Sequence, residues 1–112
     1  VMRQRLAQLY IETEALRLSN LRGLTRLLRG EPPGPEGSAA KLFFSETWQR
    51  LLECVLELQG PYATLWEGSE RAIDDGYWQF RFLRSRGDTI AAGTSEIQRN
   101  ILGERVLGLP KD

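Results

Sequence analysis

Polar residues gather where the last predicted helix of the chain begins. Gly93-Thr94-Ser95-Glu96 forms a turn that opens a short amphipathic helix running to about Gly108. The first N–H groups of a helix have no partners inside it, and this end carries a partial positive charge. Such ends bind polar ligands and phosphate groups. The sequence therefore predicts a site for a polar ligand or cofactor at Thr94, which can also cap the helix.

The absence of histidine limits the nucleophilic and metal chemistry of the chain. One cysteine, Cys54, and no histidine are present, which excludes Ser-His-Asp and Cys-His catalysis and zinc sites of the Cys/His kind within this chain. Cys54 lies among Leu51, Leu52 and Val55, so we interpret it as a buried structural thiol. No metal site is predicted, and a chain without an internal disulfide fits a reducing cytoplasm.

The charge balance argues against a nucleic acid as the partner. Lys and Arg number 15 and Asp and Glu number 15 among the 112 residues, whereas nucleic-acid-binding domains carry a basic surplus. Aromatic residues and arginines are interleaved between positions 71 and 86, and we interpret them as packing aromatics beside solvated arginines. No apolar run approaches the roughly 20 residues that a membrane-spanning helix needs.

The elements that position these residues are all predicted to be helices. Apolar residues at intervals of three and four indicate helices over 2–29 and 39–58, the second capped by Ser38, with a Pro/Gly loop over 30–37. A shorter helix is expected over 76–84, bounded by Gly76 and Gly87, and the last helix starts near Thr94. No segment shows sustained alternation, so the predicted fold class is all-α.

The two long predicted helices have broad apolar faces, and the shorter helices are too few to bury them. Such faces need a further helix, supplied by an upstream part of the polypeptide or by another subunit. The pattern is already helical at Met2, and no N-cap residue precedes it. We therefore expect the natural polypeptide to extend upstream and the chain to be a fragment.

Three stretches carry a resemblance to a known family. They are residues 3–10, residues 40–46 and, above all, residues 82–110, which include Gly-Thr-Ser-Glu-Ile-Gln-Arg-Asn-Ile-Leu-Gly-Glu-Arg-Val-Leu-Gly-Leu-Pro. Together they resemble the C-terminal helical domain of the acyl-CoA dehydrogenases, in the form found in actinobacteria. The resemblance implies that residues 1–112 form an incomplete up-and-down four-helix bundle. Its first helix and the family's N-terminal helical and middle β domains would be absent.

The resemblance also implies a reaction. Family members are flavoenzymes that oxidise an acyl-CoA thioester to the 2,3-enoyl-CoA, and for this protein we expect a cytoplasmic location. A carboxylate removes the α-proton, the β-carbon gives a hydride to FAD, and an electron-transferring flavoprotein accepts the electrons. The enzymes are homo- or hetero-oligomers that act in fatty acid or steroid catabolism. The acyl substrate of this protein stays open, and the isolated chain is expected to be inactive.

Matching the family motifs residue by residue gives the expected site. Thr94 and Glu96 match positions that contact the flavin, and Glu57 and Gly60 match the element that meets the FAD diphosphate of a neighbouring subunit. Ala92 occupies the usual position of the catalytic base and cannot abstract a proton, so the catalytic residue is unknown. Glu96 and Glu104 are interpreted as solvated or cofactor-edge carboxylates rather than as substitutes for it.

Three alternatives follow from the departures at Glu57, Pro61 and Ala92. The base could lie upstream in the same polypeptide, as in some family members. The chain could instead belong to a degenerate, non-catalytic subunit that pairs with an active one. Third, it could be a helical interaction module without flavin chemistry.

Overall fold

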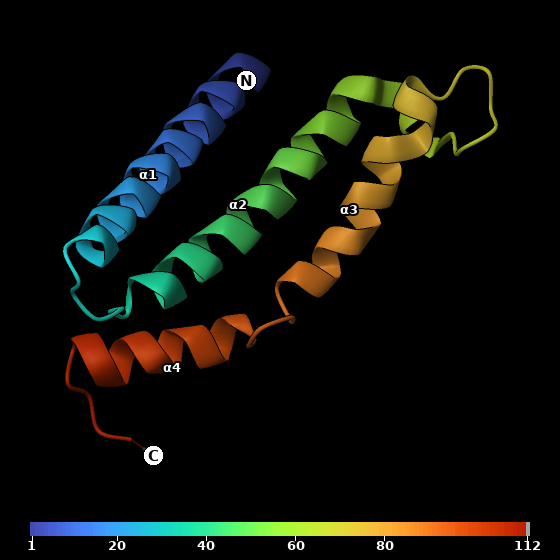
Figure 1. Cartoon of the computed structure of the whole chain (residues 1–112). Helices are drawn as coiled ribbons and strands as arrows, with labels where there is room; N and C mark the ends of the chain where they lie inside the picture. The colour runs from blue at the N-terminus through green and yellow to red at the C-terminus, as the bar shows by residue number, and fades with distance from the viewer. Residues whose placement is uncertain (112) are drawn as a thin grey trace.

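Four α-helices and two short 3₁₀ helices make up the computed structural model, which describes residues 1–111 (Figure 1). The α-helices are α1 (Met2–Leu28), α2 (Glu36–Gln59), α3 (Tyr77–Asp88) and α4 (Ser95–Val106). The 3₁₀ helices η1 (Gly60–Thr64) and η2 (Ile73–Gly76) flank the loop between α2 and α3. No strand occurs among the described residues, so the predicted all-α class is confirmed.

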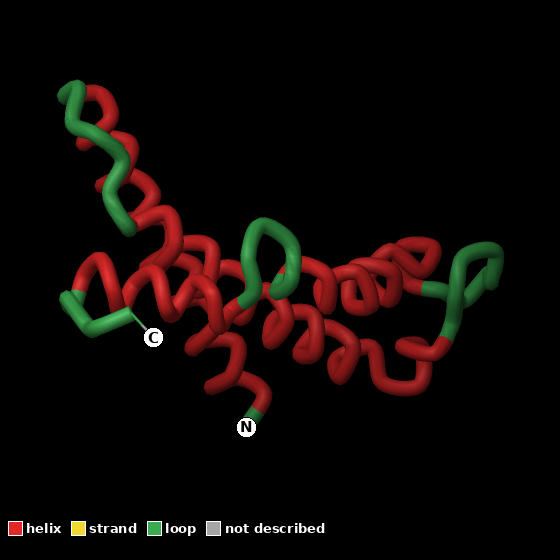
Figure 2. The backbone as a smooth tube through the Cα atoms, turned by 90° about the horizontal axis from the view of Figure 1, so that it is seen from below, coloured by secondary structure: helices red, strands yellow, loops and turns green. Residues whose placement is uncertain are grey.

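Helix α2 is the centre of the arrangement, because α1, α3 and α4 each pack against it. The chain runs along α1, reverses through the loop into α2, and reverses again into α3 (Figure 1). Seen from below, α1 crosses α2 at an angle (Figure 2). Helix α4 lies across the N-terminal end of α2 (Figure 1). The start of α4 is therefore positioned by α2 and by the loop that leaves α3.

The fully buried apolar core is small. It consists of Leu52, Cys54 and Leu9, with relative exposures of 0%, 1% and 8%. The interpretation of Cys54 as a buried structural thiol is thus confirmed. Many larger apolar side chains stay exposed, including Leu18, Leu21, Leu24, Leu27 and Leu28 of α1. An exposed apolar surface of this extent is typical of an interface, in agreement with the expected need for a further packing partner.

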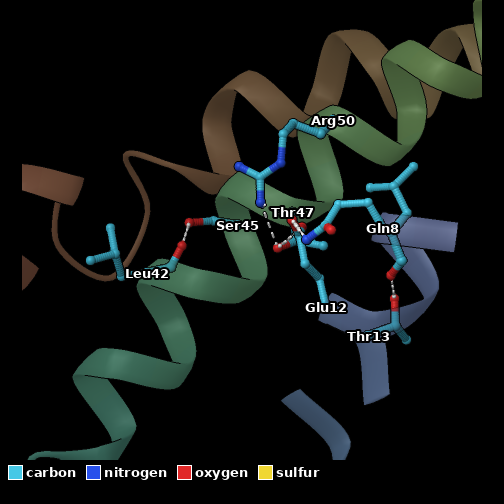
Figure 3. A network of polar contacts seen from close by, with 8 residues as sticks. Gln8, Glu12, Thr13, Leu42, Ser45, Thr47 and Arg50 are labelled. Carbon is cyan, nitrogen blue, oxygen red and sulfur yellow. Dashed lines mark hydrogen bonds and ion pairs between the residues drawn. The ribbon is translucent and has the colours of Figure 1, made fainter. Parts of the chain in front are cut away.

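A polar network ties α1 to α2 (Figure 3). The Glu12 carboxylate accepts hydrogen bonds from the Arg50 guanidinium at 2.7 Å and from the Thr47 hydroxyl at 3.2 Å. These hydrogen bonds, above all that from Arg50, hold the pKa of the Glu12 carboxyl below its usual range. Thr47 is buried, so the network fixes how α1 sits on α2.

Two predicted boundaries were wrong. Ser38 does not cap α2, because the helix begins two residues earlier at Glu36, with Pro35 as its N-cap residue. The fixed φ of proline suits a helix start, the Ser38 N–H already bonds to the Pro35 carbonyl at 3.0 Å, and Arg26 pairs with Glu36. Helix α3 begins at Tyr77 and continues to Asp88 instead of ending near residue 84.

Gly87 does not break α3 because its surroundings support the last turn. The Arg84 guanidinium pairs with the Asp88 carboxylate one turn later at 3.4 Å, a favourable spacing on a helix. From α2, the Gln49 amide donates to the Ser85 carbonyl at 3.0 Å. Tertiary contacts thus override the weak helix propensity of glycine.

Candidate functional site

The start of α4 has the predicted capped geometry. Thr94 adopts an extended conformation (φ −64°, ψ 165°), and its hydroxyl oxygen accepts a hydrogen bond from the Ile97 N–H at 3.3 Å. A side chain that caps in this way satisfies only one of the four N–H groups without partners inside the helix. The predicted helix start and the capping role of Thr94 are therefore confirmed.

The turn before Thr94 has an unusual backbone. Ala92 (φ 56°) and Gly93 (φ 97°) both lie in the left-handed region. For alanine this conformation costs roughly 1–2 kcal/mol, and such strain is commonly found at functional sites. Any other residue would be strained at the φ of Gly93, and its Cβ would lie 2.6 Å from the Gln98 amide nitrogen, which would have to shift. The turn is consequently held in one shape that the local sequence does not favour by itself.

Two side chains from neighbouring helices hold this turn in place. The Gln98 amide of α4 donates to the Ala92 carbonyl at 2.8 Å, and Gln98 is only 6% exposed. The Lys41 ammonium of α2 donates to the Gly93 carbonyl at 2.6 Å and to the Thr89 carbonyl at 3.4 Å. Because both contacts end on backbone carbonyls, they fix the path of the chain into Thr94.

Sequence reasoning did not single out Lys41, Gln49 or Gln98. Gln49 contributes by donating to the Thr89 hydroxyl at 3.3 Å, just before the turn. The only available signal was that each is a long polar residue within an amphipathic helix, and such residues are usually exposed. Lys41 and Gln49 act on the carbonyl and the hydroxyl group of Thr89, respectively, which lies 40 or more residues further along the chain. Periodicity cannot reveal such contacts.

Glu96 lies beside Thr94 in the first turn of α4 and is exposed. Its own backbone N–H, followed by the Thr94 side chain, lowers the pKa of its carboxyl from the ordinary value. The positive charges of Arg99 and Lys41 act in the same direction. A carboxylate with a lowered pKa is a weaker base, so Glu96 is suited to a fixed negative charge rather than to proton abstraction.

Ala92 places no proton acceptor at the usual position of the base. Its side chain is a methyl group, and its backbone carbonyl already accepts a hydrogen bond from the Gln98 amide. Proton abstraction requires a group within hydrogen-bond reach of the substrate. Ala92 therefore cannot act as a base.

The second predicted group lies at the other end of α2. Gly60 ends this helix with a left-handed φ of 56°, and Pro61 follows in η1 without an N–H to donate. The Glu57 carboxylate pairs with the Arg5 guanidinium of α1. Gln59 faces inward, is buried, and accepts a hydrogen bond from the Gln79 amide at 2.9 Å.

The structure brings Thr94 and Glu96 together but separates them from Glu57 and Gly60. Lys41, which holds the Thr94 turn, precedes Gly60 by 19 residues along one helix, or about 28 Å at 1.5 Å per residue. Figure 1 shows the start of α4 and the end of α2 near opposite ends of the molecule. The four residues thus form two separate groups within one chain.

An open apolar groove lies between α1, α2 and α4. Its volume is about 680 Å³, and its walls include Leu16, Leu24, Leu42, Phe43 and Leu102. Among the described residues, no cluster of three or more His, Cys, Asp or Glu side chains could hold a metal ion. Within the same residues, no helix combines the length and the apolarity that crossing a membrane requires.

Comparison with known families identifies the domain. Residues 1–107 match the family described as "Acyl-CoA dehydrogenase, C-terminal domain". The chain belongs to this family. The family predicted from the sequence is therefore confirmed, and members are generally FAD-dependent.

Curated relatives come from mycobacteria. The chain is 37% identical over 112 residues to acyl-CoA dehydrogenase IpdE1 of Mycolicibacterium smegmatis, covering 100% of this chain and 26% of that protein. It is 31% identical over 109 residues to acyl-CoA dehydrogenase FadE26 of Mycobacterium tuberculosis, covering 95% of this chain and 27% of that protein. The chain thus spans about a quarter of the length of these relatives.

Solved structures show the same fold. The ChsE4–ChsE5 complex from Mycobacterium tuberculosis matches with a TM-score of 0.86 and 30% identity, over 99% of this chain and 29% of that chain. The Tcur3481–Tcur3483 steroid ACAD matches with a TM-score of 0.89 and 23% identity, again over 99% and 29%. The helical arrangement is therefore that of the C-terminal domain of this family.

Proposed function

We propose that this domain is part of an FAD-dependent acyl-CoA dehydrogenase that oxidises an acyl-CoA thioester to the 2,3-enoyl-CoA. The domain would contribute to the FAD site and to a subunit interface. The observation that carries the proposal is the turn at residues 92–94, which Lys41 and Gln98 hold in a strained conformation at the start of α4. Strain maintained in this way is expected where a ligand needs a preformed surface.

The residues at this turn fit a flavin. Thr94 presents a hydroxyl beside the N–H groups that open α4, and such groups hydrogen-bond to the oxygen and nitrogen acceptors of a bound cofactor. Lys41 and Gln98 keep the turn in shape without occupying it, since both bind carbonyl groups. When bound, FAD would supply the hydride acceptor. Glu96 would place a fixed negative charge at the edge of the cofactor.

The residues at the other end of α2 fit a diphosphate less well. Glu57 is an acid where a neutral amide is usual in the family, and Pro61 offers no N–H. Arg5 compensates the charge of Glu57, and Gly60 retains a left-handed turn. We therefore propose that Thr94 and Glu96 are the stronger cofactor contacts and that Glu57 and Gly60 contribute weakly.

A second candidate is favoured by Ala92. Because this residue cannot accept a proton, the domain would belong either to an enzyme with its base elsewhere in the polypeptide or to a subunit that has lost catalysis. The ChsE4–ChsE5 relative is a complex, which supports a hetero-oligomer. The proposed partners are thus the acyl-CoA substrate, an electron-transferring flavoprotein and a further subunit, all in the cytoplasm.

The test uses the full-length protein, purified alone and together with any co-encoded partner. Flavin absorbance and dye-coupled oxidation of acyl-CoA esters are measured in both preparations. Flavin and activity in the protein alone support a base within the same polypeptide. Activity only in the presence of the partner supports the degenerate subunit. A preparation that binds no flavin in either state would leave only the helical interaction module.

A further inference from the structure

Most charged side chains of α2 are compensated by another helix of the domain. Glu46, Arg50, Glu53 and Glu57 form ion pairs with Arg99, Glu12, Arg86 and Arg5, respectively. Lys41, near the N-terminal end of α2, differs from them. Its ammonium forms no ion pair with a carboxylate of residues 1–111 and donates to two backbone carbonyls instead. A positive charge without a counter-ion therefore lies beside the turn at residues 92–94.

This position is electrostatically unfavourable for a cation. Lys41 bonds to the carbonyl of Gly93, the residue before the N-cap of α4, and the N-terminal end of a helix is itself partially positive. The Glu96 N–H and then the Thr94 side chain lower the pKa of the Glu96 carboxyl most. The positive charges of Arg99 and Lys41 lower this pKa further, so the charge of Lys41 reaches the first turn of α4.

The peptide bond between Gly93 and Thr94 connects Lys41 with the proposed cofactor site. The carbonyl and the N–H of a trans peptide point in opposite directions, and the described chain has no cis peptide bond. Because the Gly93 carbonyl points to the Lys41 ammonium at 2.6 Å, the Thr94 N–H points away from it. No backbone acceptor among residues 1–111 is paired with this N–H, which leaves it available to a ligand.

The cation on the carbonyl oxygen strengthens the donor at the other end of the same peptide. The hydrogen bond from Lys41 is short and charge-assisted, and linked hydrogen bonds polarise one another. Electron density drawn towards the Gly93 oxygen leaves the Thr94 N–H more positive. Such a preorganised donor stabilises an acceptor most where negative charge develops on it.

Gln98 is the neutral counterpart of Lys41 in the preceding peptide. Its amide donates to the Ala92 carbonyl at 2.8 Å, so both side chains hold the backbone but only Lys41 contributes a charge. A role limited to holding the turn would require only a neutral donor at position 41. Substitutions at this position can therefore separate an electrostatic role from a structural one.

We propose that Lys41 is a positioning residue whose charge stabilises the reduced form of the bound flavin through the Gly93–Thr94 peptide. In the proposed reaction, the C–H bond at the α-carbon breaks and its proton goes to a carboxylate. The C–H bond at the β-carbon also breaks and its hydride goes to FAD, while a double bond forms between the two carbons. The hydride adds one negative charge to the cofactor, and a positive charge behind the Thr94 N–H favours this addition. The inference rests on the proposed function.

The flavin reduction potential of the full-length protein, purified with any co-encoded partner, tests this assignment. The potential is measured against a reference dye during slow enzymatic reduction. K41M removes the charge and the donor, K41Q removes the charge and keeps a neutral donor, and K41R keeps both. The matched control is R50M, which removes a cation of the same helix that Glu12 already compensates. Arg50 follows Lys41 by nine residues, or about 13 Å along the helix.

In K41Q and K41M the equilibrium between reduced and oxidised flavin should shift at least tenfold towards the oxidised form, or about 30 mV for a two-electron couple. K41R and R50M should keep the wild-type potential. Hydrogen exchange over residues 89–102, measured in the same variants, reports how well the turn is held. A potential that follows these exchange rates instead of the charge at position 41 would overturn the proposal. Loss of oxidised flavin from K41Q would also overturn it, because Lys41 would then act in binding.

The flavin content of the wild-type complex separates this inference from the proposed function. If the wild-type complex binds flavin and K41Q keeps the wild-type potential, the assignment of Lys41 fails and the proposed function stands. If the wild-type complex binds no flavin, the proposed function fails and the assignment of Lys41 fails with it.

Discussion

Replacing Gly93 by alanine should release the turn that precedes α4. The alanine would have to adopt a left-handed φ of 97°, and its Cβ would lie 2.6 Å from the Gln98 amide nitrogen. The backbone conformation costs roughly 1–2 kcal/mol. Displacing Gln98 leaves a buried amide and the Ala92 carbonyl unpaired, at about 1–3 kcal/mol. Alanine offsets about 0.4–1 kcal/mol of this by restricting the unfolded chain, so the net loss should be about 1–4.6 kcal/mol.

Hydrogen exchange of the full-length protein measures this loss locally. At 1.4 kcal/mol per factor of ten, peptides covering residues 89–102 should exchange about 5- to 2000-fold faster in G93A, since local opening governs exchange. The control is G23A, because nothing lies within 4 Å of a Cβ at that helical position and alanine should stabilise α1 by roughly 0.5–1 kcal/mol. Unchanged exchange over 89–102 in G93A would refute the account of the turn.

Three further variants probe the cap, the ion pairs and the core. T94A should weaken the start of α4 by about 1 kcal/mol and lower flavin content, whereas T94S should retain both; equal flavin in T94A would contradict the assigned contact. Because Arg50 lowers the pKa of Glu12, the stabilisation from this carboxylate is present above the ordinary value of 4.5 and is lost as the pH falls through the lowered value. E12Q should lack this component, so the unfolding free energies of E12Q and of the wild type, measured by acid unfolding, should converge at low pH. A difference between the two that does not change with pH would refute the linkage. L52A should cost about 2–5 kcal/mol in thermal unfolding, because Leu52 is fully buried, and a loss below 1 kcal/mol, about that of an ordinary mutation, would contradict this.

Helix positions could be predicted because their signals are local. The three- and four-residue spacing of leucines located α1 and α2, and Thr94 marked the start of α4 through its capping chemistry. The failures at Ser38 and Gly87 have a tertiary cause. Arg26 reaches from α1 to Glu36 and supports an earlier start of α2, while Gln49 supports the end of α3.

The candidate site could be predicted only in part. The motif around Thr94 located the turn, but its left-handed backbone at Ala92 and its attachment to Lys41 and Gln98 depend on contacts between separate helices. The ion pair of Glu57 with Arg5 was not foreseen, because the two residues lie 52 positions apart. The assignments of Thr94, Glu96, Glu57 and Gly60 to a cofactor stay predictions.

The most direct test of the central claim is a structure of the full-length complex purified with its flavin. We expect the Thr94 hydroxyl or the first N–H groups of α4 to lie within hydrogen-bond distance, about 3 Å, of an acceptor atom of FAD. A flavin bound elsewhere, with the turn at residues 92–94 facing solvent or covered by protein, would contradict the claim.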